Sequence, residues 1–434
     1  MGLFASSISL RLPISRISRI TLLQCMQDNN SRLFKIVCYS VLQNLSQDVN
    51  YRIKCLMSLF FLTFFIVYGS VHVYTFFKAR QAVGFGTVTA AILTFFFSVL
   101  ALAPLLVRLA ERDKYESLAR FLAYTGYCWM GILFLFFSSA LVLDFYNILL
   151  QVIGYILRKD FTYLASANTP AFFVPLGCGI LFAFYGYFEA RNIRTERVVI
   201  SSPKIPKTIK KLTIVQISDV HLGLIVREER LIRILDTVRA ADPDILVSTG
   251  DLVDGQINEL KGLAELFKGV TPRYGKFAVT GNHEFYAGLK QALEFTERSG
   301  FKILRGEQAT VAGLVNIAGI DDPAGGSGNV AGHVDEKALL SKLSRDKFNV
   351  FLKHRPAVED GNVGLFDLQL SGHVHKGQIF PFNLVTHLFY PVKSGYSQMT
   401  QYSSLYVSRG TGTWGPPIRF LSPPEVTVIE LIPS

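Results

Sequence analysis

Long apolar runs in the first half of the chain predict membrane-spanning helices. A helix that rises about 1.5 Å per residue needs about 20 apolar residues to cross a hydrocarbon layer about 30 Å thick. Four runs come close to or exceed this length, at residues 56–77, 83–107, 121–143 and 171–188. A further apolar stretch, 145–157, follows Asp144 and contains Asn147 and Gln151. These polar residues predict a helix at the membrane surface and not a fifth span.

Shorter apolar runs alternate with amphipathic stretches after residue 212. Runs of strand length occur at residues 212–217, 245–248, 277–279, 310–320, 350–352, 368–370, 405–407 and 425–432. Helical periodicity occurs at residues 228–241, 259–269, 289–299 and 336–344. Alternation of strands and helices is typical of layered α/β folds, so the second half predicts an α/β domain.

These patterns divide the chain into four parts. Residues 1–50 form an N-terminal extension, 51–190 an all-α transmembrane region of four helices, 191–211 a linker with two prolines, and 212–434 the α/β domain. For the extension, a disordered tail, a transit peptide and a segment myristoylated at Gly2 all stay open.

Composition and charge support a membrane protein with a soluble part. Of the 434 residues 50% are hydrophobic and 18% are charged, whereas soluble domains carry about 25% charged residues. Residues 1–200 contain 18 Lys and Arg against 9 Asp and Glu, and residues 201–434 contain 26 against 24, so the net charge of +11 divides into +9 and +2. The basic excess therefore flanks the apolar runs, and no basic patch indicates a nucleic-acid partner.

The flanking charges also predict an orientation in the bilayer. With four spans, nine Lys and Arg residues lie near the membrane on the side of the two termini and four lie on the other side. Because cytoplasmic loops carry the excess of Lys and Arg, we expect a multi-pass protein whose α/β domain is cytoplasmic. The lipid bilayer is then its first partner.

Cysteine and histidine are distributed in opposite ways. All five cysteines precede residue 200, and seven of the eight histidines follow it. A disulfide framework in the second half is excluded, and metal chemistry is expected there.

Acidic, amide and imidazole side chains follow the predicted strands in five places. In chain order they are Asp219 and His221, Asp251 and Asp254, Asn282, His283 and Glu284, then His354, then His373 and His375. Ligand sites of α/β sheets lie beyond the carboxyl ends of strands, so these loops can meet at one rim. On an extended chain, residues two apart face the same way, and Asp219 can then reach one ion together with His221.

This set of ligand types favours transition metals. Carboxylate, imidazole and amide oxygen together suit Mn²⁺, Fe or Zn²⁺ better than Mg²⁺, and we expect Mn²⁺ first. The set exceeds the needs of one ion, and two ions about 3.5–4 Å apart can clamp a phosphate and activate a bridging water. A single Asp or His at a strand end is more often structural, but five such pieces in this order favour a metal centre.

The order Asp-x-His, Gly-Asp-x-x-Asp, Gly-Asn-His-Glu, His and Gly-His-x-His resembles the calcineurin-like metallophosphoesterases over residues 212–432. The resemblance implies an αββα sandwich with a dinuclear centre. It implies a first metal on Asp219, His221 and His375, a bridging Asp251, a second metal on Asn282, His354 and His373, a catalytic His283 and orienting roles for Asp254 and Glu284. His283 would contact the phosphate and protonate the leaving group or stabilise the transition state.

Three further segments, 320–322, 371–378 and 409–415, resemble the membrane-anchored branch of that family. One departure is Lys376, where the branch usually has glycine. This lysine could contact a substrate phosphate or point to solvent, and both interpretations stay open.

The resemblance and the spans together imply a membrane-anchored, metal-dependent phosphoesterase that hydrolyses phosphodiester or pyrophosphate bonds with a metal-activated water. Its phosphate-containing substrate is either a lipid-linked phosphate or a soluble nucleotide. One alternative is a membrane scaffold or sensor that binds metal without turnover. Another is a transporter with a fused domain, which is disfavoured because His72 is the one ionisable candidate inside the spans.

Overall fold

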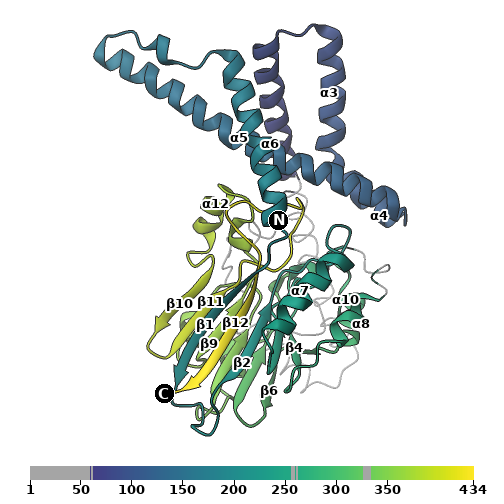
Figure 1. The fold of residues 1–434 in the computed structure, drawn as a ribbon, viewed down its shortest axis with the longest axis vertical. Coiled ribbons are helices and arrows are strands. Elements are labelled where there is room, and N and C mark those ends of the chain that lie inside the picture. Colours follow the sequence, from purple (N-terminus) through teal and green to yellow (C-terminus); the bar gives the residue numbers. More distant parts are fainter. Residues whose placement is uncertain (1–58, 60–61, 256–259, 261, 326–333) are drawn as a thin grey trace, which may run out of the picture. The chain divides into compact units, whose positions relative to one another are not determined.

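The computed structural model describes the chain except residues 1–58, 60–61, 256–259, 261 and 326–333 (Figure 1). The predicted N-terminal extension, including Gly2, lies outside the described residues. The chain divides into two compact units, Met1–Ser70 and Val71–Ser434. One helix, Leu62–Val83, crosses the boundary between them. The other described helices and strands lie in the second unit.

Three described helices are long and apolar enough to cross a membrane: Leu62–Val83, α5 (Glu116–Leu157) and the segment Thr162–Glu189, which contains α6 (Asn168–Glu189). The second predicted span, residues 83–107, forms two helices bent by 51° at Leu102, α3 (Thr87–Ala101) and α4 (Ala103–Arg112). The bend coincides with a proline in the first turn of α4, which lacks the N–H that a continuous helix would use. The four expected spans are found if this bent pair counts as one.

The prediction of a separate surface helix at residues 145–157 is wrong, because this stretch continues α5, which is 42 residues long. The polar residue that suggested a break, Asp144, accepts a 2.6 Å hydrogen bond from Tyr74 and forms an ion pair with Lys78. With its charge paired, Asp144 does not interrupt the helix. At about 63 Å, α5 is about twice as long as a hydrocarbon layer is thick.

The second half of the chain forms two six-stranded sheets. The first has the order β1-β12-β2-β3-β4-β5, with β1 Arg194–Ser202, β12 Glu425–Pro433, β2 Leu212–Ile217, β3 Ile245–Ser248, β4 Lys276–Ala278 and β5 Lys302–Ile303. The second has the order β10-β11-β9-β8-β7-β6, with β10 Gly395–Thr400, β11 Ser403–Val407, β9 Leu368–Ser371, β8 Phe348–Leu352, β7 Val315–Gly319 and β6 Glu307–Val311. Strands β2 to β5 are parallel, as are β7, β8, β9 and β11.

The layers of this domain are helix, sheet, sheet and helix. Side chains of both sheets, among them Ile214, Val247 and Leu370, share one buried cluster that lies between them. A second cluster packs the outer face of the first sheet against α7 (Glu228–Ala240), α8 (Leu263–Lys268) and α10 (Leu289–Arg298). A third packs the second sheet against α11 (Glu336–Leu340). The fold class is therefore the predicted helical region followed by an αββα sandwich.

The first sheet begins ahead of residue 212. Residues 194–202, in the segment predicted as a linker, form β1, which pairs in parallel with β12 over nine residues. Alternate side chains of β1, Val198 and Ile200, pack against the cluster between the sheets. The run at 310–320 is likewise not one strand, because β6 and β7 form a hairpin that turns at Ala312 and Gly313, both with positive φ.

Candidate metal centre

The candidate ligands follow five parallel strands of the two sheets. Asp219 and His221 follow β2, Asp251 follows β3, Asn282 and His283 begin α9 (Asn282–Ala287) after β4, His354 follows β8, and His373 and His375 follow β9. The carboxyl ends of parallel strands meet at one edge of a sheet, which brings distant parts of the sequence together. All these side chains are buried except that of His373, which is partly exposed.

The loop geometry differs from the extended chain that the i and i+2 spacing predicts. Five candidate ligands have left-handed backbone angles: Asp219 (φ 52°), His221 (φ 54°), Asp251 (φ 51°), His373 (φ 73°) and His375 (φ 48°). Such a conformation costs a residue with a side chain about 1–3 kcal/mol and persists where the surroundings enforce it, often at functional sites. Tight turns, and not alternation along a strand, therefore aim these side chains.

Asp219, His221 and His375 form one group, with ligand atoms within 4.8 Å of one another. The Nε2 atoms of His221 and His375 are 3.1 Å apart, and His375 Nε2 is 3.3 Å from Asp219 Oδ1. Nitrogen and oxygen atoms that converge in this way suit a shared cation. The three residues are those that the family resemblance assigns to a first metal.

Asp251, His354 and His373 form the second group. His354 Nε2 is 3.1 Å from Asp251 Oδ2 and 3.2 Å from His373 Nδ1. The other ring nitrogen, His354 Nδ1, donates to the carbonyl of Thr249 at 2.8 Å, which orients Nε2 towards Asp251 and His373. Asp251 Oδ2 is also 3.8 Å from His221 Nε2, so one carboxylate oxygen adjoins both groups.

One unsatisfied polar atom supports the fit of these residues to a metal ion. The buried Asn282 Oδ1 has no hydrogen-bond partner. A buried polar atom left unpaired costs about 1–3 kcal/mol, and a cation beside it would satisfy it. Asn282 Oδ1 supplies the amide oxygen expected beside the second group.

Comparisons with known proteins agree with this geometry. The family profile of the calcineurin-like phosphoesterases matches residues 212–377. An uncharacterized metallophosphoesterase of Aquifex aeolicus is 37% identical over 253 residues, which are 58% of this chain and 97% of that protein. The chain belongs to the calcineurin-like metallophosphoesterases. Its family therefore makes it a metal-dependent phosphoesterase that acts on a phosphate ester.

Two other metallophosphoesterases extend the comparison. One from Campylobacter jejuni is 31% identical over 375 residues, 84% of this chain and 96% of that protein, so the similarity reaches into the helical region. A transmembrane protein with a metallophosphoesterase domain from Danio rerio is 32% identical over 261 residues, 57% of this chain and 60% of that protein. This metallophosphoesterase thus has a relative that is itself named a transmembrane protein.

Electrostatics favours the metal-binding form of most of the candidate ligands. Burial, together with the charge of His283, lowers the pKa of His221 to about 3, and burial with the charge of His354 lowers the pKa of His373 well below its usual range. Burial opposes ionisation of Asp251, but the charges of His354 and His283 hold its pKa below the usual range. Neutral imidazoles and an ionised carboxylate are the forms that coordinate metal.

His354 differs from the other rings. Burial lowers its pKa, but the charge of Asp251 and a hydrogen bond from His354 to Asp251 outweigh burial and raise the pKa to about 10. Without a cation the ring therefore holds a proton at neutral pH. Binding of a metal at Nε2 requires the loss of that proton, so metal affinity should rise with pH.

His283 lies beside the first group and is held by two carboxylates. Its Nδ1 is 2.8 Å from Asp254 Oδ1, and its backbone N–H donates to Asp251 Oδ1 at 2.8 Å. Burial lowers the pKa of His283, but Asp251 and Asp254 outweigh burial and raise it. A charged His283 can donate a proton to a phosphate ester or neutralise its charge. The Tyr286 and Trp414 rings flank it, with centroids 5.5 and 5.6 Å away.

Glu284 fixes the loop after β3 to the loop after β4. Its carboxylate accepts backbone N–H groups of Gly281 at 2.6 Å, Leu252 at 2.7 Å, Asp251 at 3.0 Å and Val253 at 3.2 Å. The carboxylate thus positions Asp251 and Asn282 without being placed in either group. The orienting role that the family resemblance implies for Glu284 stays a prediction.

The sequence did not predict the role of Arg419 beside the candidate ligand His375. This side chain is completely buried, and it donates to the carbonyls of Gly412, Arg409 and Ser422 at 2.7–3.0 Å. Its Nη2 lies 3.2 Å from His375 Nδ1, so it supports a candidate ligand. Arg419 stands in none of the motifs, and its role depends on contacts that the sequence does not show.

Lys376, the residue after the candidate ligand His375, is partly exposed, and its backbone is left-handed.

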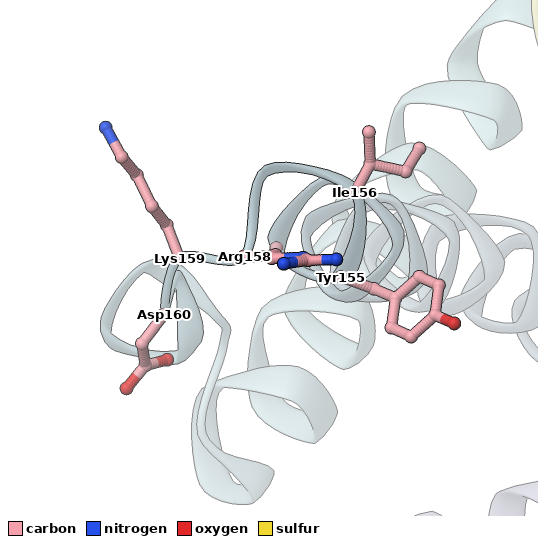
Figure 2. A pocket seen from close by; sticks show the side chains of 6 residues that line it. Tyr155, Ile156, Arg158, Lys159 and Asp160 are labelled. Atoms are coloured by element: carbon pink, nitrogen blue, oxygen red, sulfur yellow. The ribbon is translucent and has the colours of Figure 1, made fainter.

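A pocket at the end of α5 is lined by Arg158, Lys159, Asp160 and three neighbours (Figure 2). The pocket contains none of the candidate ligands and is not part of the metal centre.

Proposed function

We propose that this metallophosphoesterase is a membrane-anchored hydrolase of phosphodiester or pyrophosphate bonds with a dinuclear centre. The observation that carries the proposal is the position of Asp251 Oδ2, 3.1 Å from His354 Nε2 in one group and 3.8 Å from His221 Nε2 in the other. A bridging carboxylate between two sets of ligands is what two ions that share one phosphate need.

In this proposal each group holds one divalent ion, with Mn²⁺ favoured and Fe or Zn²⁺ as alternatives. Asp219, His221 and His375 would hold the first ion. His354 and His373 would hold the second together with Asn282, whose Oδ1 is unpaired, and Asp251 would be shared between the two. When bound, the ions supply an activated water as the nucleophile and offset the negative charge of the phosphate.

The remaining chemistry belongs to side chains that bind no metal. His283, whose Nδ1 is 2.8 Å from Asp254 Oδ1, donates a proton to the leaving oxygen or stabilises the transition state. Asp254 holds the His283 ring by its Nδ1, so that Nε2 is free to face the substrate. Glu284 keeps the loops after β3 and β4 in register.

In this proposal the helical region is a multi-pass anchor. With four spans, the excess of Lys and Arg on the side of the termini favours a cytoplasmic phosphoesterase domain. Its substrate is then either a lipid-linked phosphate at the membrane surface or a soluble nucleotide. Labelling of a Lys207→Cys variant in intact cells, in a background without the native cysteines, tests the orientation. Reaction with an impermeant maleimide before lysis would contradict a cytoplasmic domain.

The test of activity uses the full-length chain, purified in detergent and loaded with Mn²⁺, with Asp251→Asn as the control. Its substrates are an aryl phosphodiester, an aryl phosphomonoester and a lipid pyrophosphate. We expect turnover of the diester or the pyrophosphate, and a loss of at least about 100-fold in the variant. Equal rates for the wild type and the variant would show that the proposed enzymatic activity is wrong. Bound metal without turnover would favour a scaffold or sensor.

A further inference from the structure

Helix α12 (Phe382–Phe389) comes soon after His375, the last of the candidate ligands along the chain. It follows the short helix η4 (His375–Gly377), which begins with a residue of the first group. It ends at Tyr390, whose ring centroid is 5.7 Å from that of His373 in the second group. The position of α12 is therefore tied to both groups.

One face of α12 exposes large apolar side chains. Phe380, just before the helix, is 40% exposed, Leu384 is 59% exposed and Leu388 is 80% exposed. Leu384 and Leu388 are four apart and share a face of the helix, whereas Thr386 on the other side is buried. Two large apolar side chains exposed on one helix face, close to the exposed Phe380, can form part of an interaction site.

Contacts with the membrane helices indicate what covers this face. The Phe382 ring packs edge to face on Phe134 of α5, with centroids 6.2 Å apart. Ile379, which precedes α12, belongs to a buried apolar cluster with Leu135 of α5 and Ala183 of α6. The start of α12 is thus continuous with the apolar surface of two candidate spans, which lipid would surround in a bilayer.

Charge around α12 also fits a lipid surface. The sequence contains no Asp or Glu between Asp367 and Glu425, a stretch that includes Lys376 and Lys393 on the two sides of α12. Basic residues beside an apolar helical face are typical of helices that lie in the interface of membranes with anionic lipids.

We propose that α12 inserts its Leu384 and Leu388 face into the boundary between head groups and acyl chains of the bilayer that holds α5 and α6. Because α12 adjoins both metal groups, the site then opens at the membrane surface and takes phosphate esters of lipids. This second statement rests on the proposed function, whereas the insertion of α12 does not.

The first experiment measures insertion without any activity. The full chain, with its native cysteines replaced, carries a bimane label at Leu388→Cys and is reconstituted into vesicles of phosphatidylcholine and phosphatidylglycerol. The matched control carries the label at Tyr402→Cys, a 66% exposed position on the turn between β10 and β11. We expect brominated acyl chains to quench the label at 388 at least twofold and the label at 402 by less than a tenth as much. Equal quenching at both positions, or none at 388, would overturn the proposal.

The second experiment asks whether the inserted helix selects the substrate. In Leu388→Glu and Leu384→Glu we expect turnover of a lipid pyrophosphate in vesicles to fall about tenfold, because a carboxylate opposes insertion. Turnover of a soluble aryl phosphodiester should stay within twofold, as in a Tyr402→Glu control. Unchanged turnover of the lipid would refute lipid selection by α12. If the wild type hydrolysed neither substrate, the proposed function would fail while the quenching result still stood.

Discussion

The helical region exposes many of its large apolar side chains on its surface, whereas the phosphoesterase domain buries them in its interior. On α3 and α5, Phe95 is 73% exposed and Val142 is 68% exposed, whereas in the sheets Leu370 and Val350 are completely buried. The residues buried between the helices are mostly small, and they include Ala119, Ala123, Gly126, Ala140 and Gly179. Small residues let helix backbones approach closely, which is how helices associate in lipid.

The contrast teaches that one physical preference gives two sequence patterns. In water, apolar side chains leave the solvent, so strands alternate or are apolar throughout and pack face to face. In lipid the solvent is itself apolar, so bulky side chains can face outward and packing decides which residues meet. The chemistry is confined to the region built in water, where ionised groups can be placed at strand ends.

The largest expected effect tests whether a side chain of the phosphoesterase domain, His283, contributes to turnover without binding metal. In His283→Ala we expect metal content to stay unchanged and kcat to fall about 10²–10³-fold, because one electrostatic stabiliser of the transition state is lost. Elemental analysis and steady-state assays of the full chain measure the two quantities. A loss of metal with surviving turnover would show that the catalytic role proposed for His283 is wrong.

One substitution made in both regions tests the contrast itself. Leu370→Ala opens a cavity between the sheets and should lower the free energy of unfolding of the domain by about 2–5 kcal/mol. Leu181→Ala on α6, where the side chain is 61% exposed, should change it by less than about 0.5 kcal/mol. Denaturation of both variants in the same vesicles measures the difference. Equal losses would mean that Leu181 is packed against protein and not against lipid.

A smaller effect is expected where a carboxylate orients ligands without binding metal. Glu284→Gln keeps the size of the side chain but weakens acceptance of the N–H groups of Gly281, Asp251, Leu252 and Val253. We expect metal affinity or turnover to fall about 10–100-fold, as when other outer partners of metal ligands are changed. The surface variant Glu229→Gln on α7 is the control and should change neither. An unaltered affinity and rate in Glu284→Gln would contradict the orienting role.

The sequence predicted the candidate site better than the details of the fold. The site follows from short motifs at strand ends, and the structure brings Asp219, His221 and His375 together, as it does Asp251, His354 and His373. Their metal-binding roles stay predictions. The left-handed turns that aim these side chains could not be foreseen, because residues other than glycine rarely adopt them.

The features that the sequence did not predict depend on partners far along the chain. The continuity of α5 through Asp144 depends on Lys78, 66 residues earlier, and the strand β1 depends on β12 at the other end of the domain. Arg419 has a role only because the chain folds back to place it beside His375. Local pattern carries no information about such contacts, so the predicted boundaries at residues 145 and 212 differ from the structure.

The smallest expected effect lies where the two regions meet. Gly186 of α6 accepts the backbone N–H of Arg419 at 2.9 Å, and a Cβ at Gly186 would lie 2.7 Å from the Arg419 carbonyl oxygen. Gly186→Ala should therefore displace the loop that holds Arg419 and cost about 1–3 kcal/mol, as overpacking does, against a gain of about 1 kcal/mol in helix propensity.

Gly177, on the same helix, is the matched control, since a Cβ there would meet nothing within 4 Å. Gly177→Ala keeps the propensity gain of about 1 kcal/mol without the clash, so its thermal midpoint should not fall. We expect only Gly186→Ala to lower the midpoint of the phosphoesterase domain, and to weaken metal binding slightly because Arg419 supports His375. If both variants behaved alike, the contact between Gly186 and Arg419 would not couple α6 to the metal centre.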